Sequence, residues 1–166
     1  MDDYVLALCQ RMEEWGKTCR GKAVDTVYFG GGTPSLLGGA RLTHLLRAAR
    51  EQFNIVPGAE ITVECNPDSM DDALLAALAQ AGVNRLSIGV QSAKDDELQL
   101  LGRRHSFLQA KQAVARARQH SFTNLSLDLM YALPGQTTAR ALESVQALLD
   151  MQPEHISCYA LKICLL

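Results

Sequence analysis

A run of three glycines at positions 30–32 follows the apolar segment 27–29 and precedes Thr33 and Pro34. Glycine weakens the interior of a strand, so these residues are expected to serve backbone conformation or the close approach of another group. Without Cβ atoms, they leave N–H groups free to bind a carboxylate or a phosphate. The segment therefore predicts a ligand-binding loop, with a simple tight turn as the alternative. It fails as a dinucleotide-binding fingerprint, because a serine stands where the third glycine should be.

Polar side chains also follow or interrupt the other apolar runs. Glu64 and Gln91 each come directly after such a run; alternatively, Glu64 accepts N–H bonds in the Asn-Pro turn that follows and Gln91 caps the next helix. Asp128 lies inside the apolar run 125–131, where an unpaired carboxylate would cost several kcal/mol. We therefore expect Asp128 to have a partner, either a ligand donor or an internal cation such as Arg85.

The remaining chemically versatile residues carry weaker signals. Arg103, Arg104 and His105 are by default a solvated loop, and the four histidines show no metal-ligand spacing. The five cysteines include none at CxxC or CxxxCxxC spacing, which favours reduced and mostly structural thiols.

The elements that position these residues follow from the hydrophobic periodicity. Strands are predicted to start near residues 26, 60, 85, 125 and 156, and each except the last is followed by a helix. Such βα units require parallel strands joined by right-handed crossovers. The pattern is compatible with a (β/α) barrel, or part of one, and with an open doubly wound sheet. In both, ligands bind at the carboxyl ends of the strands, where the polar residues above fall.

The helices are predicted at 2–17, 39–53, 95–101, about 106–120 and 137–151, with a further Leu/Ala-rich helix that Gly82 ends. We expect Pro57 and Gly58 to end the unit formed by the first strand and the helix at 39–53. Ser69, with Asp72 three residues later, resembles a capping box for the Leu/Ala-rich helix, and Ser106 is predicted to cap the helix after it. The sequence shows no internal repeat or long linker, so we expect one domain over residues 1–166.

Composition narrows the function. The chain is 48% hydrophobic and carries a net charge of −2, so it can bury a core and shows no basic field for nucleic acid or for an anionic membrane. No window approaches the ~18 apolar residues of a membrane span, and the N-terminus is acidic where a secretory signal would be basic. These features favour a cytoplasmic protein with a small-molecule ligand.

Five motifs together resemble the radical S-adenosylmethionine family. They are Phe-Gly-Gly-Gly-Thr-Pro-Ser (29–35), Glu-Cys-Asn-Pro (64–67), Leu-Ser-Ile-Gly-Val-Gln-Ser (86–92), Leu-Gly-Arg-Arg-His (101–105) and Leu-Asp-Leu-Met-Tyr-Ala-Leu-Pro-Gly-Gln (127–136). The resemblance is closest to the oxygen-independent coproporphyrinogen III oxidase-like branch, and within it to haem chaperones more than to the oxidase itself.

The resemblance implies a partial (β/α) barrel that binds S-adenosylmethionine across the strand ends. It also implies a role in haem handling or porphyrin metabolism, with haem as a further ligand and a haem-accepting protein as a partner. Coproporphyrinogen dehydrogenation, a non-catalytic S-adenosylmethionine-binding module and an unrelated phosphate-binding protein are the alternatives. The resemblance implies that the methionine moiety is held by Gly31, Gly32 and Thr33. It implies that the rest of the S-adenosylmethionine sites is lined by Glu64, Gln91, Arg103, Asp128 and Ala160.

The sequence departs from the family at the cluster motif. Family members hold a [4Fe-4S] cluster with a CxxxCxxC motif that precedes the first helix, and the cluster reduces S-adenosylmethionine to release a 5′-deoxyadenosyl radical. Cys9 and Cys19 lie within or after the predicted first helix at a different spacing. We expect the chain to be an internal portion of such a protein, without the first strand and the last units, to do no radical chemistry by itself and to self-associate through open sheet edges.

Overall fold

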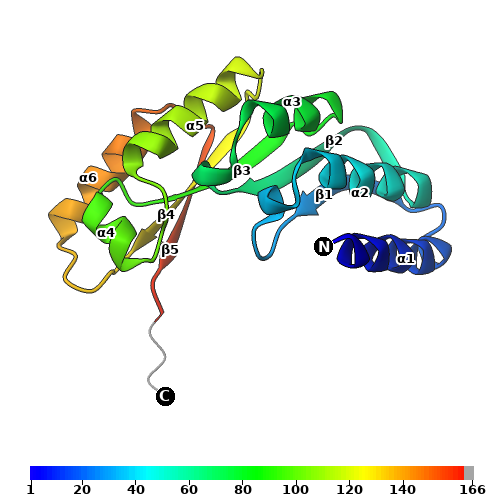
Figure 1. Ribbon diagram of the computed structural model, residues 1–166, viewed down its shortest axis with the longest axis horizontal. Coiled ribbons are helices and arrows are strands. Elements are labelled where there is room, and N and C mark those ends of the chain that lie inside the picture. The colour runs from blue at the N-terminus through cyan, green and yellow to red at the C-terminus, as the bar shows by residue number, and fades with distance from the viewer. Residues whose placement is uncertain (163–166) are drawn as a thin grey trace.

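The computed structural model describes residues 1–162, which form a curved sheet of five parallel strands with helices along its outer side (Figure 1). The strands are neighbours in the order in which they occur in the chain. A doubly wound sheet would reverse its strand order at a switch point, so the sequential order identifies the partial (β/α) barrel. The strands are β1 (Ala23–Phe29), β2 (Asn54–Cys65), β3 (Arg85–Gln91), β4 (Leu125–Tyr131) and β5 (His155–Ala160).

Within residues 1–162, six α-helices connect or flank these strands, and two short 3₁₀ turns follow β1 and β2. The helices are α1 (Asp2–Thr18), α2 (Gly39–Gln52), α3 (Asp72–Gln80), α4 (Asp95–Leu100), α5 (Phe107–Gln119) and α6 (Thr138–Leu149), and the turns are η1 (Pro34–Leu37) and η2 (Pro67–Ser69). The predicted elements are therefore all present, with ends that differ by a few residues.

The hydrophobic core lies between the convex face of the sheet and the helices. Alternate residues of the central strands, such as Leu86 and Ile88 in β3 and Leu127 in β4, are completely buried there. The residues between them face the concave side and are polar, as Ser87 and Asp128 show. On this face of β4, Ser126 is buried and Asp128 is half-buried.

Two sequence predictions about turns are wrong. Pro57 and Gly58 do not end a unit; they lie inside β2, in a segment that is unpaired because the register shifts between Val24 and Thr26 of β1. Proline is tolerated there because no ladder N–H is required. The N-cap of α3 is Asp71, whose carboxylate accepts from the Leu74 N–H at 2.7 Å.

The side chain proposed as that cap has another role. Ser69 donates to the Asn66 carbonyl at 2.9 Å and lies 2.6 Å from the Ser35 hydroxyl, so it joins the loops after β1 and β2. The predicted cap of α5 is confirmed: Ser106 accepts from the Gln109 N–H, and the Gln109 side chain accepts from the Ser106 N–H.

At the N-terminus, α1 packs against α2 beside the β1 end of the sheet (Figure 1). Val5 is buried in this contact, whereas Trp15 is 56% exposed and does not belong to the packed face. Cys9, Cys19, Cys65 and Cys158 are free thiols, and Cys164 lies outside the described residues. Between residues 1 and 162, none of the helices combines the length and the apolar character that a membrane crossing requires.

Candidate functional site

A hollow of about 230 Å³ opens at the carboxyl ends of the strands, on the concave side of the sheet. Residues from the loops after β1, β2 and β3 and from β4 and β5 meet there. Seven of the eight residues predicted from the sequence line it: Gly31, Gly32, Thr33, Glu64, Gln91, Arg103 and Asp128. The hollow is also lined by Cys65, Asn66, Ser87, Gly89 and Tyr159.

The glycine loop is held in place by Glu64. One carboxylate oxygen accepts from the Gly31 N–H at 3.1 Å, and the other accepts from the Tyr28 hydroxyl at 2.8 Å. Gly31 has φ +113°, a backbone conformation that residues with a Cβ rarely adopt. Glu64 therefore bonds across to the neighbouring loop rather than within its own Asn-Pro turn.

Tyr28 is tied to this carboxylate electrostatically as well. Burial, followed by the hydrogen bond to Glu64, raises the pKa of Tyr28 to about 12. A neutral phenol is therefore maintained beside the glycine loop, where it acts as a hydrogen-bond donor.

The loop after β2 supports the far end of the glycine loop. The Asn66 side-chain amide donates to the Thr33 hydroxyl at 3.3 Å, and the Asn66 N–H donates to the Ser35 hydroxyl at 3.3 Å. Thr33 therefore reaches the hollow with its hydroxyl already partnered on one side.

Asp128 lies at the floor of the hollow, half-buried. Its partner is Ser87, whose hydroxyl donates to the two carboxylate oxygens at 3.1 and 3.4 Å. Burial raises the pKa of Asp128 to about 6, and the negative charge of Glu64 adds to this effect, while the Ser87 bond opposes it. The proposed ion pair with Arg85 is absent; Arg85 instead lies 3.9 Å from the Glu60 carboxylate.

Gln91 reaches the hollow through an irregularity at the end of β3. Ile88 pairs with Leu127 and Gln91 pairs with Leu129, so β3 has one more residue than β4 between the two pairs. Gln91 has φ +71°. A Cβ at Gly89 would lie 2.8 Å from the Gln91 side-chain nitrogen, so the glycine makes room for this amide. Gln91 does not cap the next helix, because the N-cap of α4 is Lys94.

The charged loop after α4 divides into three differently placed residues. Arg103 lines the hollow, Arg104 is exposed, and His105 is only 4% exposed. The His105 Nε2 atom lies 3.2 Å from the Val90 carbonyl, and burial lowers the pKa of His105. The loop is therefore anchored to the end of β3, and only Arg104 fits the solvated-loop interpretation.

Ala160 is the predicted residue that does not line the hollow. It is the last residue of β5, is exposed, and pairs with Tyr131 of β4. The preceding residue, Tyr159, forms the wall at this strand. Five lining residues were not among the eight predicted, namely Cys65, Asn66, Ser87, Gly89 and Tyr159. Tyr28 was not predicted either, and it supports the site through its bond to Glu64. The signal for Tyr28 and Ser87 was strand alternation, because each lies on the same face as a predicted neighbour.

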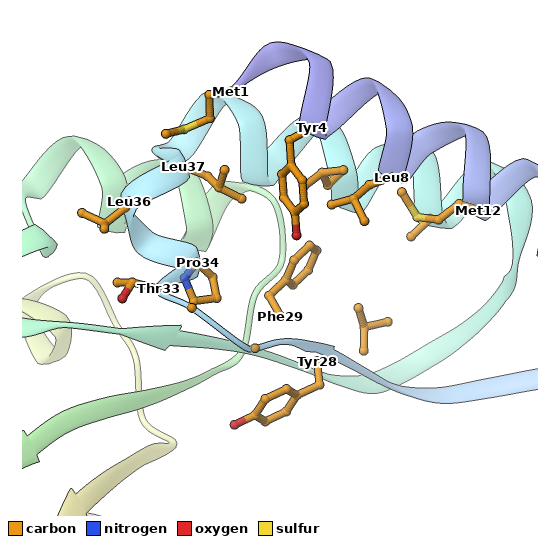
Figure 2. Close-up of a pocket in the computed structure, with 15 residues that line it drawn as sticks. Met1, Tyr4, Leu8, Met12, Tyr28, Phe29, Thr33, Pro34, Leu36 and Leu37 are labelled. Atoms are coloured by element: carbon orange, nitrogen blue, oxygen red, sulfur yellow. The ribbon is translucent and has the colours of Figure 1, made fainter. Parts of the chain in front are cut away.

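A larger apolar groove of about 520 Å³ lies on the other side of the glycine loop. Figure 2 shows Tyr4, Leu8 and Met12 of α1 facing it, opposite Phe29 of β1, while Tyr28 points away from it. The groove is lined mainly by hydrocarbon, so it offers few groups for binding a charged ligand. The chemistry therefore belongs to the smaller, polar hollow.

The donor set of the polar hollow fits S-adenosylmethionine. Glu64 and Asp128 offer carboxylate oxygens to hydroxyl or cationic groups, and Arg103 offers a guanidinium to a carboxylate. Within residues 1–162, no three His, Cys, Asp or Glu side chains are grouped so that they could hold a metal ion.

Comparisons with known proteins agree with this geometry. The sequence pattern of the radical SAM superfamily matches residues 4–148. The chain is 38% identical to the heme chaperone HemW of Escherichia coli (strain K12) over 162 residues, which cover 98% of this chain and 43% of that protein. It is 40% identical to HemW of Mycobacterium tuberculosis (strain ATCC 25618 / H37Rv) over 162 residues, covering 98% of this chain and 42% of that protein.

Among solved structures, the radical SAM enzyme coproporphyrinogen III oxidase (HemN) of Escherichia coli superposes with a TM-score of 0.88 at 30% identity, covering 96% of this chain and 37% of that one. The chain therefore spans less than half the length of these relatives. The match over residues 4–148, together with the sequential half-barrel, establishes that this chain belongs to the radical SAM superfamily.

Proposed function

We propose that this chain is part of a HemW-like protein that acts in haem transfer, and that it contributes the β1–β5 portion of an S-adenosylmethionine site. The observation that carries the proposal is the convergence of seven predicted residues on one hollow at the strand ends. The similarity to HemW over almost the whole chain supports the haem-related role.

Each part of the hollow suits a part of S-adenosylmethionine. The glycine loop and Thr33 are suited to the charged amino acid end, and Arg103 is suited to its carboxylate. Asp128 and Glu64 are suited to ribose hydroxyls and to the positive sulfonium, and the Gln91 amide can pair with polar atoms of the nucleoside. S-adenosylmethionine, when bound, supplies the reactive sulfonium group, and these residues hold and orient it.

Equilibrium dialysis with radiolabelled S-adenosylmethionine tests the site. We expect saturable binding that Asp128→Asn weakens and that Glu13→Gln, on the exposed face of α1, leaves unchanged. Inorganic phosphate serves as the competitor. Displacement by millimolar phosphate would show that the hollow is a phosphate site, and binding unaffected by Asp128→Asn would show that this carboxylate does not contribute to the site.

A second candidate is oxygen-independent coproporphyrinogen III oxidation, which the similarity to HemN favours. The two functions differ in what the full-length gene product does. A haem-transfer protein should bind haem, detected by its Soret absorbance, and pass it to an acceptor apoprotein. An oxidase should instead convert coproporphyrinogen III, and product formation under reducing, anaerobic conditions would overturn the haem-transfer assignment.

A further inference from the structure

Glu97, in the first turns of α4, is a buried carboxylate that no part of the hollow uses. It is 5% exposed, although it belongs to a helix of only six residues. A buried carboxylate is tolerated when several donors satisfy it. Its environment therefore shows which parts of the fold it connects.

Three donors from three different segments converge on Glu97. The Ser92 hydroxyl from the loop after β3 donates to one carboxylate oxygen, and so does the side-chain amide of Gln136, at 3.1 Å, from the loop after β4. Arg140 of α6 donates through Nε to the other oxygen at 3.0 Å. Glu97 therefore fastens the loops after β3 and β4 to each other and to α6.

The segment after β3 is restrained a second time. The Ser144 hydroxyl of α6 accepts from the Ala93 N–H at 3.2 Å, and the Ser92 hydroxyl accepts from the Lys94 N–H at 3.0 Å. Ser92 and Ser144 are completely buried. The three residues that follow Gln91 are thus fixed by bonds that do not involve Gln91 itself.

These restraints act directly on an unfavourable backbone conformation. Gln91 has φ +71°, which a residue with a side chain adopts only when its surroundings enforce it. The irregularity in β3 re-aims its side chain, as such bulges do beside functional sites. The Ser92 N–H donates to the Val90 carbonyl at 3.0 Å across Gln91, and Glu97 holds the hydroxyl of the same serine.

We propose that Glu97 is a positioning residue that holds Gln91 in its left-handed conformation, with its amide aimed into the hollow. The inference rests on the proposed S-adenosylmethionine site. It assigns to Glu97 no contact with the ligand, so its effect on binding passes through Gln91.

The test compares Glu97→Gln with Asp96→Asn. Asp96 is the matched control, because it accepts two bonds of 2.7 Å from the same Arg140 but is exposed and touches neither Ser92 nor Gln136. We expect Glu97→Gln to weaken S-adenosylmethionine binding about tenfold, in line with the loss of a charged hydrogen-bond acceptor, and Asp96→Asn to change it less than about twofold. Equal binding by Glu97→Gln and the parent chain would overturn the proposal.

A double-mutant cycle separates positioning from general stability. Gln91→Gly removes the amide and accepts the positive φ without strain, so Glu97→Gln should cause no further loss of binding in that background. Losses that multiply would show that Glu97 acts independently of Gln91. If Glu97→Gln does not fold, Ser92→Ala removes the bond to Glu97 together with the bond from the Lys94 N–H, and it should give the same pattern.

Hydrogen exchange keeps the inference separate from the proposed function. Exchange of the amides of residues 91–94 should rise in Glu97→Gln and remain unchanged in Asp96→Asn, whether or not any ligand binds. If the parent chain binds no S-adenosylmethionine but this pattern appears, the proposed function fails and the positioning role stands. Unchanged exchange at these amides would refute the positioning role itself.

Discussion

Replacing Asp128 by asparagine should stabilise the fold above neutral pH. The carboxylate is half-buried at the floor of the hollow, with Ser87 as its hydrogen-bond donor, and its pKa is raised to about 6. A raised carboxyl pKa means that the folded state disfavours the charge. Asparagine has no charge and can still accept from the Ser87 hydroxyl, so the variant loses the unfavourable ionisation and keeps the bond.

The magnitude follows from the difference between a pKa of about 6 and the usual value of 3.8. At about 1.4 kcal/mol per pH unit, this difference corresponds to roughly 3 kcal/mol. The hollow is open to water, so we take about 1–2 kcal/mol after allowing for screening. A gain of that size raises the melting temperature of a chain of this length by about 2–8 °C.

The sign of the pH dependence is fixed by the same values. Well below pH 4, Asp128 is protonated in both folded and unfolded chains and contributes no cost. The cost develops between pH 4 and pH 6, as the unfolded state ionises first, and is complete above about pH 7. The stabilisation of Asp128→Asn over the parent chain should therefore be small at pH 4 and reach its full value by pH 8.

Urea denaturation followed by circular dichroism, at pH values from 4 to 8, measures this difference. Glu13→Gln, an exposed substitution on α1, controls for the loss of one negative charge. A difference that stays constant with pH, or an Asp128→Asn protein that is less stable than the parent at pH 8, would refute the reasoning. The same variant should bind S-adenosylmethionine less well, which makes this carboxylate a case of function retained at the expense of stability.

Three further predictions concern the glycine loop and the sheet edge. Gly31→Ala should destabilise the fold by about 1–2 kcal/mol because φ is +113°, whereas Gly32→Ala, with open space around its Cβ and no positive φ, should change stability by less than about 0.5 kcal/mol in the same urea assay. Glu64→Gln should lower the ionisation midpoint of Tyr28 from about 12 toward its usual value of 10.0, seen as earlier tyrosinate absorbance in an alkaline titration; an unchanged midpoint would show that burial alone sets it. The exposed apolar groove and the edges of the sheet should make the chain associate with itself in sedimentation velocity, and Leu36→Lys should weaken that association; a monodisperse monomer at all concentrations would contradict this.

The sequence predicts the order of elements well, because the periodicity of apolar residues decides it locally. The segment 125–131 is apolar enough to be predicted as a strand with the bounds that β4 has. Ser106 is identified as a cap because its partner lies only three residues away. Pro57 and Ser69 mislead because their roles are set by neighbouring segments, namely the register against β1 and the contact with Ser35.

The candidate site was predictable in its location but only partly in its contacts. A residue after a strand must lie at the carboxyl end of a parallel sheet, so Glu64 and Gln91 could be placed from the sequence. Their partners could not be placed, because the bonds to Tyr28 and Gly31 depend on how two strands are aligned. The buried Glu97 shows the same limit, since its donors are up to 43 residues away in the chain.

The polar interior and the apolar core of this half-barrel are two consequences of one alternation. Leu86 and Ile88 pack under the helices while Ser87 between them reaches Asp128 across the concave face. Because the side-chain period of a strand is two, a shift of one residue would expose the leucines and bury the carboxylate at the same time. The register that packs the core is therefore the register that assembles the hollow. Selection for a stable core in these strands consequently also maintains the geometry of the site.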